Sequence, residues 1–428
     1  MRRALTLTLT RRQAWPQASS RAVSLHHRPA LQLLSAAQPS LSRVARAFAS
    51  PTALTNSNNN NNNKPPVSWL DLRGSGLSVL ERLLLEECLV RHDPESRSWL
   101  LSGTHETVRH RFLKTTTPAY IRAAQDPNYA AVVVMGIGGK PQKLLNRTAV
   151  TDDGVLTLKR FSGGGTVILD ADSIWTTVIG RTDHFASVQA FPKPIMQWSA
   201  DTVFGPVFQR LKAKQLLATA AAARTTAAPD TTVFLQVPNH VHRFQEEQQK
   251  RKQTMVLDAK SCGVENSGRT VQVVSVPDPA AHDDDDNNAT TTTMAAPTVP
   301  DFFLRENDYV LGARKMGGNA QAIVKNGWLH HTSFLWNYDV ANMEYLTLPD
   351  KRPDYRGDRP HDEFLVQLSQ AYPALRKADF YQALQQVATE QFLVQKVTLR
   401  EALAVVETQG GMQAWFERGG RTRILHEL

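Results

Sequence analysis

The sequence predicts an α+β fold in which mixed sheets pack against helices and a helical extension forms the C-terminus. Short strand-like segments cluster early in the folded region and are joined mostly by short loops, while helical patterns stand at its beginning, middle and end. This order favours α+β over a doubly wound parallel sheet, in which strands and helices alternate. With 428 residues, 41% of them hydrophobic, the chain can bury a large core.

The first half of the folded region contains two helices and several strands. Apolar residues recur at helical spacing from Leu77 to Val90, which predicts an amphipathic helix. A second helix is expected over residues 201–217, after Pro192 and Pro194. The expected strands are residues 99–101, 130–135, 159–161, 166–169 and 174–179.

Composition changes between about residues 218 and 300, where Ala/Thr, Gln/Lys and Asp runs follow one another. We interpret this stretch as a low-complexity insertion, with a helix over 244–253 and a strand within 271–276. The run 283–286 lacks the alternating ligands of a calcium loop, which favours a solvated loop. Strands are expected again at 309–311, 320–324 and 331–336, followed by helices over 361–417. The resulting domains are a leader with an Asn-rich linker (1–63), a main domain (67–363) and a helical extension (364–428).

Nearly all of the net charge of +9 lies in the first fifty residues, which hold eight arginines, and no Asp or Glu precedes Asp71. An Arg-rich, Ser-containing leader without acids is typical of an organelle transit peptide, whereas a merely basic tail has no reason to exclude every acid. We expect import into the mitochondrial matrix, with processing near Arg46–Ser50; a plastid is the second possibility. The charge is therefore no sign of nucleic-acid binding. No apolar run approaches the roughly 18 to 20 residues that span a membrane.

The two cysteines, Cys88 and Cys262, can form neither a disulfide framework nor a CxxC metal site. Cys88 stands in the apolar helical pattern and is expected in the core, and Cys262 falls in the insertion. Neither is a strong candidate for a nucleophile.

The first chemical motif runs from Lys159 to Asp170 and contains three consecutive glycines between β-type segments. Glycines let a ligand approach the main chain closely. Arg160 adds a cation suited to a carboxylate or phosphate. The alternative is a glycine-rich hairpin without a ligand.

The second motif runs from Glu306 to Gln321 and places Lys315 just before Gly317 and Gly318. A lysine beside exposed backbone is again a cation next to a loop that a ligand can approach. A solvated surface lysine is the simpler interpretation of this residue alone. His330 and His331 then add polar groups at another strand.

Together these motifs resemble the lipoate-protein ligase A family, in the form of its eukaryotic, plant-like branch. The family pattern is Arg-Arg-x-Ser-Gly-Gly-Gly-x-Val-x-His-Asp, then Asn-Asp, Lys-Ile-x-Gly-x-Ala and His-His-Gly. It is matched at Arg160, Ser162, Gly163, Gly164, Gly165, Val167, Asp170, Asn307, Asp308, Lys315, Gly318, Ala320, His330 and His331. The sequence departs from the pattern at Lys159, Leu169 and Thr332, and Leu169 replaces a histidine. The resemblance implies a catalytic domain of the biotin/lipoate protein ligase type.

The resemblance implies attachment of lipoate, through a lipoyl-adenylate intermediate, to a lysine of lipoyl acceptor domains. ATP, Mg²⁺ and lipoate are then the substrates, and no bound prosthetic group is expected. The implied partners are the acyltransferase subunits of 2-oxoacid dehydrogenase complexes and the glycine cleavage H protein, and we expect a monomer. Lys315 is the implied catalytic residue, and Asp308 the implied magnesium ligand. The implied contacts of lipoate and nucleotide are Arg160, Ser162, Gly163, Gly164, Gly165, Asn307, Asp308, Gly318, Ala320 and His331.

The main alternative is a lipoyltransferase that takes a preformed lipoyl group from lipoyl-adenylate or from another lipoylated protein, without using ATP. Leu169 and the short C-terminal region favour it. A cysteine thioester relay lacks a cysteine in any motif, and the Gly-Arg-Gly-Arg loop of biotin ligases is absent. A non-catalytic lipoyl-domain binder is disfavoured because Lys315 is retained.

Overall fold

The computed structural model describes residues 64–106, 117–126, 129–226, 235–238, 273–276, 299–350, 352–426 and 428. The leader, the helix expected over 244–253 and the acidic run 283–286 lie outside these residues. Within them, no helix combines the length and the apolar character needed to cross a membrane.

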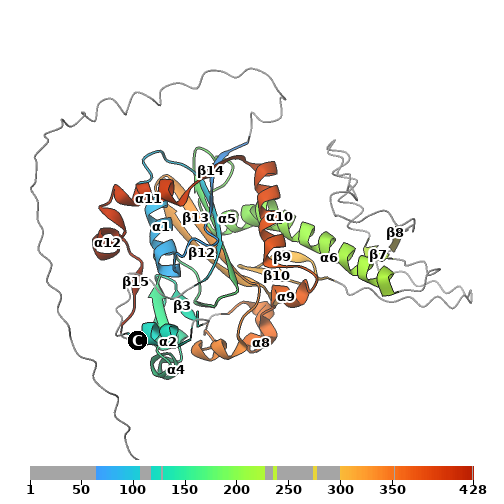
Figure 1. The fold of residues 1–428 in the computed structure, drawn as a ribbon, viewed down its shortest axis with the longest axis horizontal. Helices are drawn as coiled ribbons and strands as arrows, with labels where there is room; N and C mark the ends of the chain where they lie inside the picture. The colour runs from blue at the N-terminus through green and yellow to red at the C-terminus, as the bar shows by residue number, and fades with distance from the viewer. Residues whose placement is uncertain are drawn as a thin grey trace, which may run out of the picture. The chain divides into compact units, whose positions relative to one another are not determined.

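A six-stranded mixed sheet forms the centre of the fold (Figure 1). Its order is β12-β13-β6-β2-β1-β14, with antiparallel pairs from β12 to β2 and parallel pairs from β2 to β14. The strands are Gly317–Val324 (β12), Gly327–Leu335 (β13), Ser173–Arg181 (β6), Trp99–Thr104 (β2), Pro66–Asp71 (β1) and Leu393–Val397 (β14). Strands that are distant in the sequence therefore lie side by side, and β12 is left as an edge.

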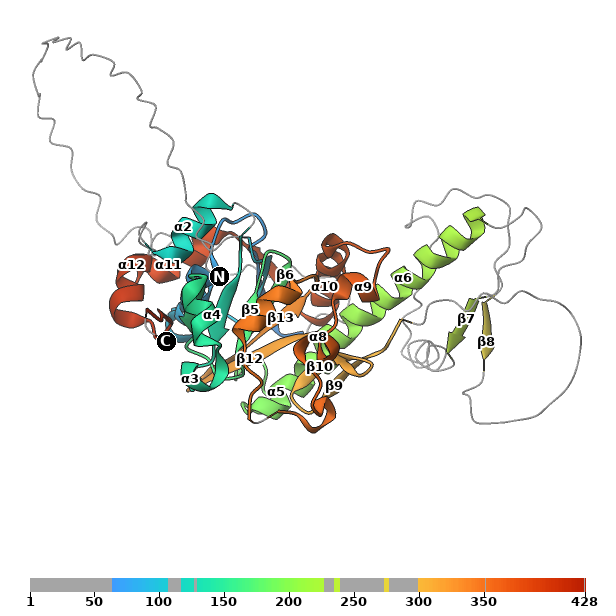
Figure 2. The same cartoon turned by 90° about the horizontal axis from the view of Figure 1, so that it is seen from below.

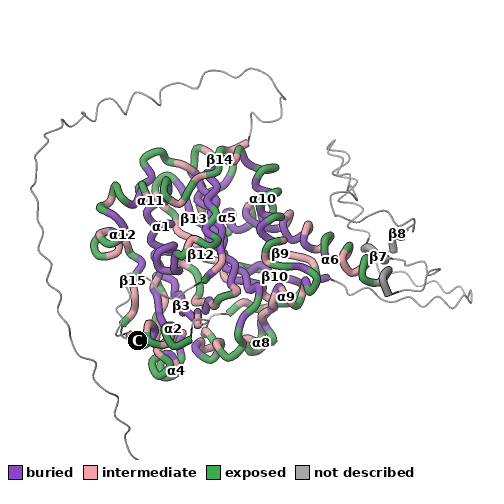
Figure 3. Tube along the Cα trace, viewed as in Figure 1, coloured by how far each residue is buried: buried purple, intermediate pink, exposed green. Residues whose placement is uncertain are grey.

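Helices cover both faces of this sheet, so its inner strands β13, β6 and β2 are buried on both sides (Figure 3). Adjacent residues point to opposite faces: Leu100 packs into one core cluster, whereas Trp99 and Leu101 pack into the other. The first cluster contains residues of α6 and α10, and the second contains residues of α1 and α11. These helices are Gly205–Thr226 (α6), Lys377–Gln391 (α10), Val79–His92 (α1) and Leu399–Glu407 (α11).

Helix α1 begins after Ser78, which forms a capping box with Glu81. The Ser78 side chain accepts from the Glu81 amide, and the Glu81 side chain accepts from the Ser78 amide, which satisfies two free donors of the first turn. The helix is buried along most of its length, and two acidic residues, Glu86 and Glu87, lie in its buried part with no exposed surface. Such charges need partners.

A second, four-stranded sheet lies beside the first in the order β15-β4-β3-β5. It consists of Arg423–Ile424 (β15), Leu156–Lys159 (β4), Val132–Met135 (β3) and Val167–Leu169 (β5). The first motif connects β4 to β5, so the glycine loop lies between two strands of this sheet. The short helices near it are Pro118–Gln125 (α2), Pro141–Leu144 (α3) and Arg147–Asp152 (α4).

A three-stranded antiparallel sheet carries the first part of the second motif, whereas the rest of the motif, from Gly317, lies in β12 of the central sheet. The three-stranded sheet is formed by Phe302–Arg305 (β9), Asp308–Leu311 (β10) and Arg314–Lys315 (β11). The helix expected over 201–217 is longer than predicted. It begins as Pro192–Ser199 (α5) and continues through a π-helical turn, Ala200–Phe204, into α6 (Figure 2). In the insertion, Leu235–Pro238 (β7) pairs with Val273–Val276 (β8). Strand β8 lies within the expected range 271–276, whereas β7 was not predicted.

The predicted α+β class with mixed sheets is confirmed, and the C-terminal region contains the expected helices. They are His361–Phe364 (α8), Leu368–Ala371 (α9), α10, α11 and Gly411–Ala414 (α12), followed by a π-helical turn, Trp415–Gly419. Two strands in this region were not predicted: β14 extends the central sheet and β15 extends the second sheet. The remaining 3₁₀ turns are Val340–Tyr345 and Asp354–Arg356.

Candidate active site

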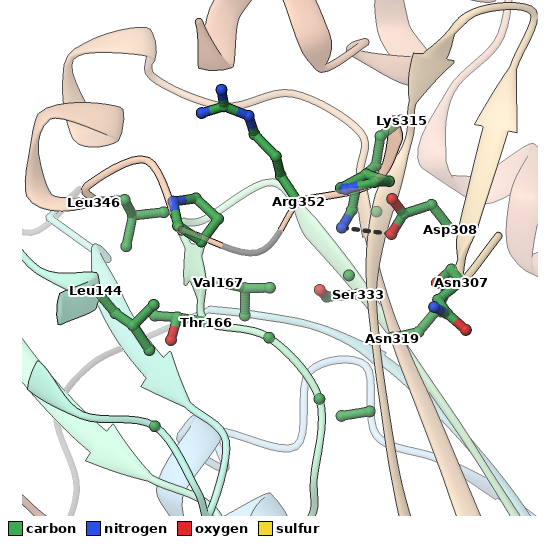
Figure 4. Close-up of a pocket in the computed structure, with 18 of the residues that line it drawn as sticks. Leu144, Thr166, Val167, Asn307, Asp308, Lys315, Asn319, Ser333, Leu346 and Arg352 are labelled. Carbon is green, nitrogen blue, oxygen red and sulfur yellow. Dashed lines mark hydrogen bonds and ion pairs between the residues drawn. The ribbon is translucent and has the colours of Figure 1, made fainter. Parts of the chain in front are cut away.

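A cavity of about 810 Å³ lies where the two motifs meet, next to the edge strand β12 (Figure 4). Residues of the glycine loop, the β9–β12 region and the segment 343–365 line it. The predicted site residues among them are Gly163, Gly164, Gly165, Asn307, Asp308, Lys315, Gly318 and Ala320. The structure thus brings most of the predicted site into one cavity.

The cavity has an apolar side and a charged side. Leu144 and Leu346 lie across the cavity from Lys315 and Asp308 in Figure 4, and Val167 lies between them. Such a cavity can hold an apolar chain and a charged group in one molecule.

The glycine loop lies tightly against the edge strand β12. The Gly163 amide donates to the Gln321 carbonyl at 2.7 Å. Gly164 adopts a φ of +102°, and a Cβ on it would lie 2.6 Å from the Asn319 carbonyl oxygen. Only glycine fits there without strain or movement of the strand. At Gly165, by contrast, a Cβ would meet nothing within 4 Å.

The structure corrects the role expected of Arg160, which does not line the large cavity. Arg160 is 2% exposed, and its guanidinium donates four hydrogen bonds inside the protein. Nη2 donates to the carbonyls of Gly163 and Gly165 at 3.0 and 2.7 Å. Burial lowers the pKa of Arg160 to about 9. This arginine therefore fixes the shape of the loop instead of offering its charge to a carboxylate or phosphate.

Ser162 and His331 also lie behind the cavity wall. The two side chains contact each other at 2.8 Å, and both are almost completely buried. His331 also contacts Glu86, which no motif contains. The neighbouring His330 contacts the Tyr309 hydroxyl at 3.1 Å, and burial lowers the pKa of His330 to about 3. Both histidines are thus internal, and His331, which was expected to contact lipoate or nucleotide, does not line the large cavity.

Lys315 is held at the cavity wall by an ion pair. Its Nζ lies 2.7 Å from Asp308 Oδ1, and the Tyr355 hydroxyl donates to Asp308 Oδ2 at 2.9 Å. The Lys315 side chain is 24% exposed and that of Asp308 is 10% exposed. Burial, together with Asp308, raises the pKa of Tyr355 above its usual range, so the phenol remains a donor. The ammonium group is therefore oriented, partly desolvated and still accessible from the cavity.

Sequence reasoning missed a group of cations on the cavity wall. They are Lys140, Lys143, Arg352 and Arg356, with His361 nearby in the lining. Burial, then Arg356 and Lys315, lower the pKa of His361 to about 4, so its imidazole is neutral near pH 7. A signal was present in the sequence, because residues 352–361 combine three arginines and a histidine with two prolines. The same segment also contains two aspartates, and one of them, Asp358, pairs with Arg352. Such a segment can face an anionic ligand.

The histidine that the family pattern places at position 169 is replaced by a core residue. Leu169 is fully buried in β5, and its side chain belongs to the second core cluster, whereas Ile168 lines the cavity. The side chain at position 169 therefore points away from the cavity. Asp170 accepts from the Asp339 amide at 3.0 Å and braces the turn after β13.

The part of the chain that the structure describes has no cluster of three or more His, Cys, Asp or Glu residues able to hold a metal. Both oxygens of Asp308 are engaged, one by Lys315 and one by Tyr355. A magnesium ion at Asp308 stays a prediction, and it would have to arrive with nucleotide phosphates that complete its ligands.

Comparison with known proteins identifies the family. Residues 103–205 and 286–389 match the model of the lipoyl protein ligase A/B catalytic domain, so the chain belongs to this family. The unmatched stretch between them overlaps the interpreted insertion.

Individual relatives are similar over shorter stretches or at low identity. Inactive lipoate-protein ligase 2 of Plasmodium falciparum (isolate 3D7) is 41% identical over 71 residues, which is 14% of this chain and only 18% of that protein. A lipoate-protein ligase A structure with bound ATP is 11% identical, with a TM-score of 0.40 over 81% of this chain and 94% of the other. P. falciparum LipL1 in a complex with lipoate is also 11% identical, with a TM-score of 0.40 over 82% and 70%. The family assignment rests on the matched catalytic domain.

Proposed function

We propose that this protein attaches lipoate to a lysine of an acceptor lipoyl domain through a lipoyl-adenylate intermediate, with Lys315 as the catalytic residue. The observation that carries the proposal is the position of Lys315. An ammonium oriented by Asp308 stands in a cavity that has an apolar side for an acyl chain and cations for phosphate. Octanoate, a similar saturated acid, is left open as a second acyl substrate.

In the first step a lipoate carboxylate oxygen attacks the α-phosphorus of ATP, and pyrophosphate leaves. In the second step the acceptor lysine, as its free amine, attacks the carbonyl carbon of the mixed anhydride; AMP leaves and the new amide loses a proton. Negative charge accumulates on oxygen in both transition states. An ammonium held in place beforehand stabilises such charge, and a partly desolvated position strengthens the effect. The apolar side would hold the lipoyl chain, and Arg352 and Arg356 would face phosphate.

The second candidate is a lipoyltransferase that uses preformed lipoyl-adenylate or another lipoylated protein. Its support includes the name of the P. falciparum relative, which describes an inactive ligase. Leu169 supports it less than the sequence suggested, because the side chain at that position packs into the core. Retention of Lys315 and its Asp308 partner favours catalysis over mere binding of lipoyl domains.

The test incubates the protein and an apo lipoyl domain with one of two donors: lipoate with ATP and Mg²⁺, or lipoyl-adenylate. Acceptor modification is measured by mass spectrometry, and pyrophosphate release is measured in the first reaction. Acceptors from a 2-oxoacid dehydrogenase complex and a glycine cleavage H protein are compared.

We expect modification with both donors and pyrophosphate release that depends on lipoate. Transfer from lipoyl-adenylate without pyrophosphate release at any Mg²⁺ concentration would replace the ligase by the lipoyltransferase. Binding of lipoyl-adenylate without any transfer would identify a non-catalytic member of the family.

A further inference from the structure

A continuous row of buried polar side chains leads from helix α1 to the glycine loop. Glu86 Oε2 lies 3.0 Å from His331 Nδ1, and His331 Nε2 lies 2.8 Å from Ser162 Oγ. Arg160 Nε donates to Ser162 Oγ at 3.1 Å, and the same guanidinium binds two carbonyls of the loop. These four residues, which we call the loop relay, are each at most 3% exposed.

The hydrogen bonds of the loop relay have one consistent direction. The Glu86 carboxylate accepts from Trp175 Nε1 and Thr177 Oγ1, each at 2.7 Å on Oε1, which leaves Oε2 to accept from His331 Nδ1. A neutral imidazole with its proton on Nδ1 has a free acceptor at Nε2, to which the Ser162 hydroxyl donates. Burial, outweighing the effect of Glu86, lowers the pKa of His331 and keeps the ring neutral. Each hydrogen bond therefore polarises the next one.

Only a carboxylate at position 86 satisfies this arrangement. Three donors point at its two oxygens, and a glutamine can present an oxygen to one side only. Turned one way, a glutamine amide would face the Trp175 and Thr177 donors. Turned the other way, it would donate to His331 Nδ1 and force the proton onto Nε2, so that the Ser162 hydroxyl loses its acceptor.

The loop relay lies directly behind the wall of the candidate active site. Arg160 and His331 line a small inner cavity of about 20 Å³, which is room for about one water molecule. Val167 and Gly318 line both this inner cavity and the large one. Burying a carboxylate and a guanidinium at this depth is costly, and apolar residues of similar volume often give equal or greater stability. Stability alone therefore does not explain the loop relay.

We propose that Glu86 is a positioning residue, which acts through His331, Ser162 and Arg160 to hold the glycine loop in the shape that binds the acyl substrate. Glu86 itself touches no part of the large cavity. The kinetic part of this inference rests on the proposed function, whereas its structural part does not.

The chain provides a matched control in the next residue. Glu87 is equally buried in α1, but its carboxylate accepts from the amides of Arg421 and Thr422 and pairs with Arg91. It contacts none of the four loop-relay residues directly, although the Thr422 hydroxyl that it binds also accepts from the Phe161 amide. Glu86→Gln and Glu87→Gln therefore make the same chemical change at adjacent buried sites. Ser162→Ala is the second variant, because it interrupts the loop relay by removing a single hydroxyl.

The experiment measures hydrogen exchange of the ligand-free, full-length proteins, followed by the kinetics of lipoate. We expect Glu86→Gln and Ser162→Ala to speed exchange of the Gly163 amide about tenfold or more, because losing one charge-assisted hydrogen bond is worth about 1.5 to 3 kcal/mol. Glu87→Gln should speed exchange near residues 421–425 and at the Phe161 amide, which donates to Thr422 Oγ1, but not at Gly163. In Glu86→Gln and Ser162→Ala, the KM for lipoate should rise by about tenfold, while kcat at saturating lipoate should change by less than about threefold.

Unchanged exchange at Gly163 in both loop-relay variants would overturn the proposal, and so would equal loosening of the loop by Glu87→Gln. Loosening of the loop with unchanged KM for an active enzyme would also overturn the positioning role. If the wild-type protein shows no reaction with lipoate, the exchange result still decides whether Glu86 holds the loop, and the proposed function alone falls.

Discussion

Replacing Gly164 by alanine is the sharpest test of how the glycine loop is held. At φ +102° a non-glycine residue costs about 1 to 3 kcal/mol. The new Cβ would also lie 2.6 Å from the Asn319 carbonyl oxygen and 3.0 Å from the Ala320 Cα, both of them backbone atoms of β12. The hydrogen bond from Gly163 to Gln321 contributes only about 1 kcal/mol. The strain exceeds that bond, so we expect the loop to move away from the strand while the core stays folded.

Because the strain in Gly164→Ala exceeds the energy of the Gly163–Gln321 hydrogen bond, the substitution should change both stability and ligand affinity. The melting temperature should fall by about 4 to 8 °C, corresponding to about 2 kcal/mol. Affinity for a non-hydrolysable lipoyl-adenylate analogue, measured by calorimetry, should fall by about tenfold or more. Gly165→Ala is the control, because its Cβ meets nothing within 4 Å and its φ is not positive. Equal affinities in the two variants would refute the argument that β12 constrains the loop.

Three further predictions concern other parts of the chain. Lys315→Met should slow lipoyl transfer by about 10² to 10³-fold. It should lower the free energy of unfolding by only about 1 kcal/mol, since Asp308 keeps its hydrogen bond from Tyr355. Near-normal turnover would exclude a catalytic lysine. Burial lowers the pKa of His105 to about 4, so the folded state binds its proton less readily than the unfolded state. His105 alone should therefore lower stability in urea by about 3 kcal/mol as the pH falls from about 6.5 towards 4. His330 and His361, whose pKa values are also lowered, should add to this decline; a flat profile would contradict this. Finally, we propose that residues 1–60 direct a fused reporter into mitochondria, with cleavage near Ala49; a full-length cytosolic reporter would oppose it.

The local motifs could be predicted from the sequence because their chemistry is local. Three consecutive glycines and a lysine before Gly317 and Gly318 mark places where a ligand can approach the backbone, and the structure puts both places in one cavity. What the motifs do not show is which way a side chain points. Arg160 stands next to a glycine loop and was expected to face the ligand, but it turns inward to bind the loop carbonyls.

The role of Glu86 was not predicted, because its partners lie far from it in the sequence. In an apolar helix a glutamate is usually the exposed residue of an amphipathic pattern, and nothing near it in the sequence names its partner. Its partner, His331, is 245 positions away in the sequence. The two residues meet in the fold because β13, which carries His331, pairs with β6, whose Trp175 and Thr177 also donate to Glu86. Side-chain networks that join distant strands lie beyond a local sequence pattern.

The strand β14 was taken for part of a helical region because its apolar residues, Leu393, Val394 and Val397, do not alternate with polar ones as in a half-buried strand. It is an edge strand with mostly exposed or half-buried residues, including Leu393, which is 54% exposed. Its partner is β1, in parallel register from Pro66 with Leu393 to Leu70 with Val397. A strand that is added at an edge by a distant segment is specified mainly by its partner's backbone.

The replacement at position 169 allows a last prediction, about whether restoring the family's histidine would restore polar chemistry. Leu169 is fully buried in β5 opposite Val132, and Ile168 occupies the cavity side. Leu169→His would place ring nitrogens without partners in the core, at about 1 to 3 kcal/mol for each unsatisfied group, and it would lose apolar packing as well. We therefore expect lower stability, by about 2 to 4 kcal/mol in total, and no gain in lipoate-dependent pyrophosphate release. Leu169→Met, which nearly conserves volume, is the control and should cost less than about 1.5 kcal/mol. Faster pyrophosphate release in Leu169→His than in Leu169→Met would show that the position reaches the nucleotide, and that the loss of the histidine does bear on adenylation.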